Sequence, residues 1–416
     1  MSTISTKQES CVRPADRVET ISLGADAVLF DEVSQKLFHL NATAAGIWSQ
    51  LCGERTIRQV VDAVANLWSI DPQEARNVVL PMLRVWRRCG LLQGSPREPL
   101  SPRLREGEGY EPVAEPVQPI LADWKRRHYR MLGTTFSIGF SDSALEALVD
   151  PVLSHLSVAE PSDDARTLDI VDTGREIQVI GGYRIIGRCP TRRGLAPLIH
   201  GLVGLISIRA HPYLFAIHGS GLARPDGALI LAGRSGCGKT TMAAALMAAG
   251  WDYMSDDTIL LAPGTLEAVP VPYSLSIKQG SWSLLRSRFP ALGRNVVHVR
   301  ADDKLVRFLR PTQKTCTEGR AIRWVGFPHR SASGSSSIRS LDCTEGIYRL
   351  LEHCCAVPKL LKCSDVRDLM QWSTHVHFFE FAVRDLDEAV QQVTDLVTAD
   401  GDAPSKLRPY AFRTAS

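Results

Sequence analysis

The alternation of apolar and polar residues divides the chain into two regions. In the first region, Val18–Leu23, Ala27–Phe30 and Lys36–Leu40 have the pattern of short strands. Apolar residues then recur at spacings of three and four, which predicts three amphipathic helices. Each helix has a suitable N-cap residue: Asn41, Thr56 and Asp71. A hairpin followed by three helices predicts a small winged-helix-like domain of α+β class over residues 17–93.

The third of these helices has clear start and stop signals. Pro72 follows the Asp71 cap at the first helical position, and Gly90 follows the last apolar residues. Pro81 lies inside the pattern and is expected to kink the helix or divide it in two, because proline lacks the amide that the helix needs.

Strands and helices alternate over residues 121–405, which predicts an α/β domain. Ala228–Ala232 has the pattern of a strand buried on both faces, and a helix over 241–249 follows it. Tyr213–Gly219 is expected to be a strand that pairs with 228–232, with His218 at its end. Three further helices are expected: Arg193–Arg209, Thr344–Cys355 and Asp385–Thr398.

Prolines and charges dominate residues 94–120, which is typical of an extended linker between separately folded domains. Residues 1–16 and 406–416 are expected to be tails, and the Ser- and Gly-rich residues 331–338 a loop.

Composition narrows the possible environments. The net charge of +3 over 416 residues is too small to indicate nucleic acid or an anionic membrane as a partner. The ten cysteines form no C-x-x-C pair, and no apolar run reaches the length of a membrane span. A cytoplasmic protein is expected, and a homo-oligomer stays open.

Residues 233–240 match the G-x-x-x-x-G-K-[ST] pattern of a phosphate-binding P-loop, between a buried strand and a helix. Glycines there allow successive amides to point at phosphate oxygens, and the helix adds its positive end. This predicts a bound nucleotide, expected to be ATP with GTP left open, with Lys239 on the phosphates and Thr240 on Mg²⁺. The expected nucleotide-binding residues are Gly233, Arg234, Ser235, Gly236, Cys237, Gly238, Lys239, Thr240 and Thr241.

Asp256 and Asp257 follow the short strand Asp252–Ser255, where acidic residues beside a P-loop can bind Mg²⁺ or accept a proton. Adjacent side chains on extended backbone point in opposite directions, so one of the two is expected to face the phosphates. A surface turn is the alternative for this pair, and a structural role is the alternative for His218.

The first region resembles the PqqD-like peptide-recognition domains that accompany enzymes modifying ribosomally made peptides. The residues that carry the resemblance are Phe38–Trp48, Thr56-Ile57, Asp71–Ala75 and Gly90–Leu92. The resemblance implies that a precursor's leader adds as a strand beside Lys36–Leu40 and packs against the helix around Glu74–Arg88. Basic residues on that helix would meet acidic leader residues, or form a solvated or DNA-contacting face instead: Arg84, Arg87 and Arg88.

The stretch from His218 to Asp257 resembles the catalytic core of HPr kinase/phosphorylase, and more closely its relatives in peptide-modification clusters. A His-Gly pair, the P-loop lysine and a pair of aspartates match in spacing. The resemblance implies that Asp257 accepts the proton of the acceptor hydroxyl, with His218 and Lys239 as further catalytic residues. Thr240 and Asp256 are the expected metal ligands.

Two departures from that family are evident. Its glutamate metal ligand has no counterpart, and Lys278 stands in that part of the chain. Lys278 either replaces a metal charge, touches the substrate or is a solvated lysine. Arg323 is the candidate for the family's later arginine.

These features predict an ATP-dependent serine/threonine-type kinase acting on a precursor peptide whose leader binds the N-terminal domain. The alternatives are a nucleotide-binding peptide chaperone or regulator without phosphoryl transfer, and a DNA-binding regulator.

Overall fold

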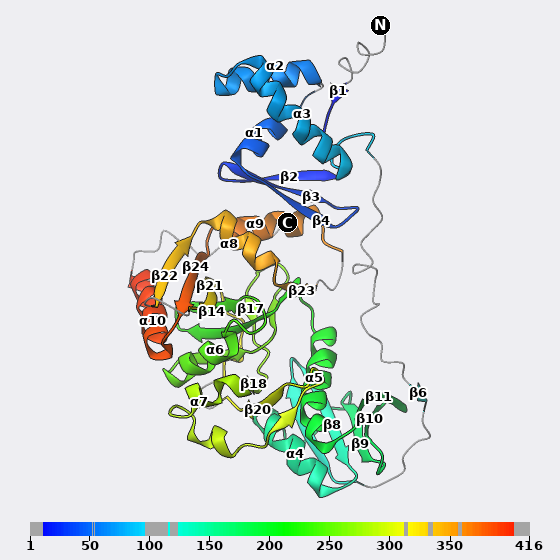
Figure 1. Cartoon of the computed structure of the whole chain (residues 1–416). Helices are drawn as coiled ribbons and strands as arrows, with labels where there is room; N and C mark the ends of the chain where they lie inside the picture. The colour runs from blue at the N-terminus through cyan, green and yellow to red at the C-terminus, as the bar shows by residue number, and fades with distance from the viewer. Residues whose placement is uncertain are drawn as a thin grey trace. The chain divides into compact units, whose positions relative to one another are not determined.

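The computed structural model describes residues 11–51, 53, 55–95, 115–116, 124–311, 315–331, 336–356 and 360–402 (Figure 1). It forms two compact units: Met1–Glu108 with Lys359–Thr374, and Gly109–Pro358 with His375–Ser416. Most of the predicted linker 94–120, the tail 406–416 and part of the predicted loop 331–338 lie outside the described residues.

The first unit, unit 1, has a three-stranded antiparallel sheet, order β2-β3-β4, covered by helices. The elements are β1 (Cys11–Val12), β2 (Val18–Leu23), β3 (Asp26–Asp31), β4 (Lys36–Leu40), α1 (Ala42–Ser49), β5 (Arg55–Thr56), α2 (Ile57–Trp68) and α3 (Pro72–Arg88). The strands and helices follow the sequence prediction closely, because local caps fix the helix starts.

The three predicted N-cap residues all accept backbone hydrogen bonds. Thr56 and Gln59 form a reciprocal capping box, which stabilises such a helix by about 1 kcal/mol. Helix α3 runs unbroken through Pro81, so the predicted division in two does not occur. Pro81 is exposed, and the carbonyl that it leaves unpaired one turn earlier can be hydrated.

The opposite face of the sheet is covered by a helix from far along the chain, α9 (Cys363–Ser373), drawn in orange below the blue strands in Figure 1. Side chains alternate along β3, so Val28 and Phe30 point away from the face that Leu29 shares with α1–α3. Both are buried, and α9 packs against the neighbouring strand β2.

Polar contacts fasten this segment to unit 1. The Gln35 side chain donates to the carbonyl of Leu361 at 2.9 Å and accepts from its amide at 2.7 Å. Cys363 Sγ lies 3.1 Å from Glu32 Oε2, and Arg367 forms an ion pair with Glu19. The predicted linker therefore accounts for one passage of the chain between the units, and residues 359–374 add two more.

The second unit, unit 2, begins with a six-stranded sheet, order β6-β11-β10-β9-β8-β7, packed on two helices. The elements are β6 (Glu115–Pro116), β7 (Arg126–Met131), β8 (Thr134–Phe140), α4 (Ser143–Leu153), η2 (Ser154–Leu156), β9 (Arg166–Asp172), β10 (Ile177–Gly181), β11 (Arg184–Cys189) and α5 (Arg192–Ala210). Two residues of the predicted linker thus pair with β11.

A second six-stranded sheet carries the P-loop and has the order β15-β13-β14-β21-β24-β22. Strands β14, β21 and β24 are parallel, so their carboxyl ends meet at one edge. The elements are β13 (Gly219–Arg224), β14 (Gly227–Ala232), α6 (Lys239–Ala248), β15 (Asp252–Ser255), β21 (Ile322–Arg330), β22 (Ser337–Leu341), α8 (Cys343–Leu351), β24 (His377–Val383) and α10 (Leu386–Asp402).

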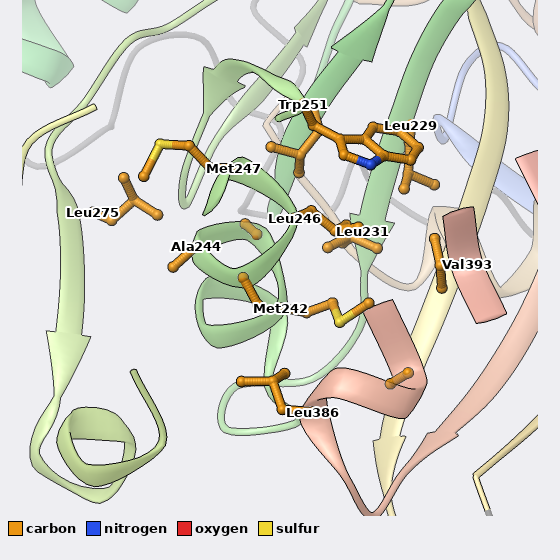
Figure 2. Packing of buried hydrophobic residues seen from close by; sticks show 14 of the residues in the cluster. Leu229, Leu231, Met242, Ala244, Leu246, Met247, Trp251, Leu275, Leu386 and Val393 are labelled. Atoms are coloured by element: carbon orange, nitrogen blue, oxygen red, sulfur yellow. The ribbon is translucent and has the colours of Figure 1, made fainter. Parts of the chain in front are cut away.

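Helix α6 lies in a hydrophobic core that also includes β14 and α10. Figure 2 shows Met242 and Leu246 of α6 among Leu231 of β14 and Val393 of α10. Every residue from Met242 to Met247 is buried, so this helix is enclosed rather than amphipathic. The P-loop at its start is therefore anchored to a rigid core on both sides.

Two smaller sheets complete unit 2, in the orders β17-β16-β12-β23 and β18-β20-β19. Their elements, with the short helices beside them, are β12 (Phe215–Ile217), β16 (Ile259–Leu261), β17 (Ala268–Val269), β18 (Leu275–Lys278), η3 (Gln279–Ser281), α7 (Trp282–Leu285), η4 (Pro290–Arg294), β19 (His298–Val299), β20 (Leu305–Leu309) and β23 (Cys354–Ala356).

Two elements of unit 2 differ from the sequence prediction. The strand predicted over Tyr213–Gly219 ends at Ile217, and β13 begins at Gly219 in a different sheet. His218 therefore lies at the crossing between two sheets. The helix predicted over 344–355 ends at Leu351, and the chain continues into β23, which pairs with β12. No helix among the described residues is long and apolar enough to cross a membrane.

Candidate functional site: a phosphate-binding pocket and a peptide-binding face

The P-loop joins β14 to α6 with the backbone that phosphate binding requires. Gly233, Gly236 and Gly238 have φ of 147°, 88° and 112°, a region that residues with a Cβ avoid. Gly238 is also the N-cap of α6, so the amides of the first helical turn point into the loop. Ser235, Gly236, Gly238, Lys239, Thr240 and Thr241 line a pocket there.

Lys239 is buried at the centre of this loop. Its Nζ donates to the carbonyl oxygens of Gly233 at 2.6 Å and Arg234 at 3.2 Å. Burial lowers the pKa of the ammonium, and nearby acidic groups oppose that shift. The loop therefore holds a positive charge in low-dielectric surroundings, where an anionic phosphate would interact with it strongly.

Asp256 is the buried acid of the pocket. Its Oδ1 accepts hydrogen bonds from Ser220 Oγ at 2.6 Å and Thr240 Oγ1 at 3.0 Å. Burial raises the pKa of this carboxyl to about 6, and the Asp257 carboxylate adds to the shift. Asp256 and the P-loop hydroxyl thus lie side by side, which is the arrangement that binds Mg²⁺ in P-loop proteins.

Asp257 lies on the open side of the same pocket. Its backbone is left-handed, with φ of 72°, a conformation that is uncommon outside glycine but that aspartate and asparagine adopt more often than most residues. This turn, rather than extended backbone, separates the two carboxylates: Asp256 is buried, whereas the Asp257 side chain is 58% exposed. Both aspartates line the pocket, although one was expected to face it.

His218 stands beside Asp257. Its Nδ1 lies 3.0 Å from the Asp257 carbonyl oxygen and 3.5 Å from the Asp257 carboxylate. Because a carbonyl only accepts, this bond requires a proton on Nδ1 and leaves Nε2 as the second ring nitrogen. The break between β12 and β13 places this histidine at the pocket, and its amide donates to His353 O at 2.9 Å.

Sequence reasoning missed several residues of this site. For Ser220 the sequence offers one local signal, the small-residue run Gly219–Gly221. In the structure a Cβ at either glycine would lie 2.7 Å from Leu231 or Ile259, so the chain there needs small residues.

Arg300 and Arg330 also line the pocket; they come from distant segments and share no motif. Ser276 and Ser281 line it beside Lys278, in the stretch 274–282 that the sequence marks as similar to the HPr-kinase-related proteins.

Some of the remaining predicted residues line the pocket and others do not. Lys278 lines the pocket, and its Nζ is 3.4 Å from Ser235 Oγ of the P-loop. Gly233, Arg234 and Cys237 belong to the loop but are not among the lining residues. Arg323 lies near the start of β21, over the ring of Trp324, whereas Arg330 at the carboxyl end of β21 lines the pocket.

The donor set suits Mg²⁺ bound together with a nucleotide. Within the described ranges, no three His, Cys, Asp or Glu residues gather into a metal cage. Mg²⁺ usually takes one or two protein oxygens and completes its shell with phosphate and water. Thr240 Oγ1 and the Asp256 carboxylate provide that minimal protein share.

In unit 1, β4 is an edge strand of the sheet, and α3 presents a partly apolar outer face. Val78, Met82 and Val85 share one side of α3, and Val78 and Val85 are 36% and 41% exposed. Arg84, Arg87 and Arg88 are exposed on the same helix. An edge strand and an apolar helix face with basic neighbours are features that an extended acidic peptide would fit.

Comparison with known proteins identifies the N-terminal part. Residues 26–92 match the family model of coenzyme PQQ synthesis protein D (PqqD). The protein is thus a mixed α/β protein with an N-terminal PqqD domain, as expected from the sequence. A search of curated proteins finds no match. Among solved structures, TbiB1 in complex with the TbiA(beta) leader peptide matches at 25% identity, covering 20% of this chain and 99% of that chain, with a TM-score of 0.19.

Proposed function

We propose that this protein is an ATP-dependent kinase that phosphorylates a Ser or Thr hydroxyl of a ribosomally made precursor peptide. The observation that carries the proposal is that two adjacent carboxylates have different surroundings in the same pocket. Asp256 is fixed to the P-loop hydroxyl of Thr240 at 3.0 Å, whereas Asp257 stays exposed in the same pocket beside His218.

Each residue then has a role set by its position. MgATP would supply the phosphoryl group and the metal charge. Lys239, Thr240 and the loop amides would hold the phosphates and the metal, together with Asp256. Asp257 would accept the proton of the acceptor hydroxyl, and positioned proton transfer of this kind contributes about 10²–10⁴-fold to a rate. His218 would orient Asp257 through Nδ1.

The PqqD domain supports a peptide as the acceptor's carrier. The leader would add as a strand at β4 and pack on Val78 and Val85 of α3, with the arginines of α3 meeting acidic side chains. Capture by unit 1 would raise the local concentration of the acceptor segment at unit 2, because both belong to one chain.

A nucleotide-binding peptide chaperone is the second candidate. It is favoured by the pocket wall beside Asp256, where Ser276 and Lys278 stand and no third acid lines the described part of the pocket. Such a protein would bind both ligands and transfer nothing.

The test incubates the chain of residues 1–416 with ATP, Mg²⁺ and a candidate precursor peptide that binds it, followed by mass spectrometry. The kinase proposal expects the mass of one added phosphate. Asp257→Asn should abolish it while ATP affinity stays unchanged, and Asp252→Asn at the far end of β15 is the matched control. Unmodified peptide with retained binding of both ligands would favour the chaperone.

A further inference from the structure

Strand β13 directs one polar side chain into an apolar core. Successive side chains alternate between the two faces of a strand, so Ser220 shares a face with Leu222. Leu231 and Leu229 of β14 lie opposite these two residues. The three leucines belong to the hydrophobic core that encloses α6, and Ser220 is fully buried beside them. A buried hydroxyl costs free energy unless it finds a hydrogen-bond partner, so the partner of Ser220 indicates what the residue does.

That partner is the buried acid of the phosphate-binding pocket. Ser220 Oγ donates to Asp256 Oδ1 at 2.6 Å, and Thr240 Oγ1 donates to the same oxygen at 3.0 Å. The backbone of Ser276 also bonds to this carboxylate. Because a carboxylate oxygen has two lone pairs, Ser220 and Thr240 together occupy Oδ1. Oδ2 keeps at least one lone pair for a metal ion or for water bound to it.

Close packing on both sides fixes the backbone at Ser220. A Cβ at Gly219 would lie 2.7 Å from the carbonyl oxygen of Leu231, and one at Gly221 would lie 2.7 Å from Ile259. The chain is therefore held tightly between β14 and β16, and the Ser220 hydroxyl moves only by rotation about its Cα–Cβ bond. Such rigidity suits a residue that sets the direction of another side chain.

Ser220 and Thr240 hold Asp256 from different places. Thr240 lines the pocket and is an expected Mg²⁺ ligand, so its oxygen would face the metal while its proton stays on Asp256. Ser220 is fully buried in β13 and is not among the residues that line the pocket. It therefore reaches the nucleotide and the metal only through Asp256.

We propose that Ser220 is a positioning residue for the metal site: its hydrogen bond fixes the Asp256 carboxylate in the orientation that MgATP binding needs. This rests on the proposed function, of which it needs only the binding of MgATP. Mg²⁺ demands nearly ideal octahedral geometry, so a carboxylate that can rotate would bind the ion or its water less well. Loss of a residue that orients a metal ligand typically lowers metal affinity by about 10–100-fold.

The test measures ATP binding to the chain of residues 1–416 by calorimetry, once with Mg²⁺ and once with EDTA. The readout is the gain in affinity that Mg²⁺ provides, because a general defect of the nucleotide site would weaken both values. Ser220→Ala should reduce this gain by about 10–100-fold and leave the affinity in EDTA unchanged. Ser220→Cys, whose thiol donates weakly, should give an intermediate gain.

A matched control removes a similar hydroxyl elsewhere. Ser274 is buried in unit 2 outside the pocket lining, and its Oγ donates to the carbonyl of Val152 at 2.6 Å. Ser274→Ala should therefore leave the gain from Mg²⁺ as in the wild type.

A second measurement follows the metal directly. In the presence of a nonhydrolysable ATP analogue, the EPR signal of free Mn²⁺ reports how tightly the ion binds. Ser220→Ala should weaken this binding, and so should Asp256→Asn. In the Asp256→Asn background, Ser220→Ala should cause no further loss, because the serine acts through the carboxylate.

Other results overturn the inference in distinguishable ways. An unchanged gain from Mg²⁺ in Ser220→Ala, with Asp256→Asn impaired, would make Ser220 a structural residue only. Additive losses in the double variant would mean that Ser220 acts independently of Asp256. If the wild type does not bind MgATP, the proposed function and this inference fail together. Normal MgATP binding without transfer to any peptide would remove the kinase proposal and leave this inference intact.

Discussion

Thr240 donates a hydrogen bond to Asp256 across 3.0 Å, and this contact joins the first turn of α6 to the end of β15. The same carboxylate oxygen accepts from Ser220 on β13. Three elements of unit 2 therefore meet at one buried acid. The negative charge of Asp256 would favour a bound metal ion, but the same buried charge lowers the stability of the fold when no metal is bound.

Asp256→Asn should stabilise the protein at neutral pH in the absence of metal. The pKa of Asp256 is about 6 in the folded state against 3.8 ordinarily, so ionising it at pH 7 costs folding free energy. Asparagine keeps an acceptor for Ser220 and Thr240 and removes that cost, which is about 1–3 kcal/mol.

The sign of this effect fixes its pH dependence. A raised carboxyl pKa makes the penalty largest above pH 6, and the penalty fades as pH falls and is absent below about 3.8. Urea unfolding with EDTA at several pH values checks it; a gain that does not change with pH would contradict it. Mg²⁺-dependent ATP affinity should fall in the same variant.

Lys278→Ala should slow phosphoryl transfer by about 10–100-fold with a smaller effect on ATP affinity. Its ammonium stands 3.4 Å from Ser235, where it can stabilise charge on the transferring group. Lys278→Arg should restore part of the rate. Single-turnover kinetics measures the transfer rate, and equilibrium binding measures ATP affinity. If only ATP affinity falls, Lys278 binds the nucleotide and does not stabilise the transition state.

Val85→Asp on α3 should weaken leader binding by about tenfold or more while leaving the fold intact. Val85 is 41% exposed, so a polar substitution there costs little stability. Leu67→Asp is the matched control, because Leu67 is 54% exposed but lies on α2. Calorimetric titration with a synthetic leader peptide measures both, and equal effects would argue against the α3 face as the peptide site.

Residues 11–95 expressed alone should be less stable than the same fragment with residues 359–374 attached. Without α9, the sheet face bearing Val28 and Phe30 loses its cover within unit 1, and burying such a side chain contributes about 1.5–3 kcal/mol. Thermal unfolding of the two fragments compares their stabilities. Identical unfolding midpoints would mean that α9 does not contribute to the stability of the sheet.

A point variant complements this comparison of fragments. Leu369→Ala, at a buried position of α9, should reduce the stabilisation by residues 359–374, whereas the exposed Gln371→Ala should not.

Local chemistry made much of this protein predictable. The caps Asn41, Thr56 and Asp71 and the P-loop with its buried strand are encoded within a few residues each. The PqqD domain was predicted from a resemblance carried by motifs between Phe38 and Leu92, and the family match over 26–92 confirms it. The kinase reaction, its cofactors and the roles of its residues remain predictions.

Contacts between distant segments escaped sequence reasoning. The α9 helix contacts residues more than 300 positions earlier: Arg367 pairs with Glu19 of β2, and Cys363 contacts Glu32, 331 positions away, in the turn after β3. The position of Arg300 follows from the register of three strands, which no local pattern encodes. The break after Ile217 was missed because no proline or charged residue separates the apolar run Tyr213–Ile217 from His218 and Gly219.

The threading of residues 359–374 through unit 1 limits how this protein can be rearranged. A peptide-recognition module joined end to end could be exchanged by recombination at a single junction. Here, replacing only the N-terminal part of unit 1 would leave α9 in place, and α9 fits the sheet of the domain that was removed. A complete exchange must therefore change the chain at three points, after residue 108, before residue 359 and after residue 374. Engineers who graft another PqqD domain onto unit 2 therefore need to supply a helix equivalent to α9 as well.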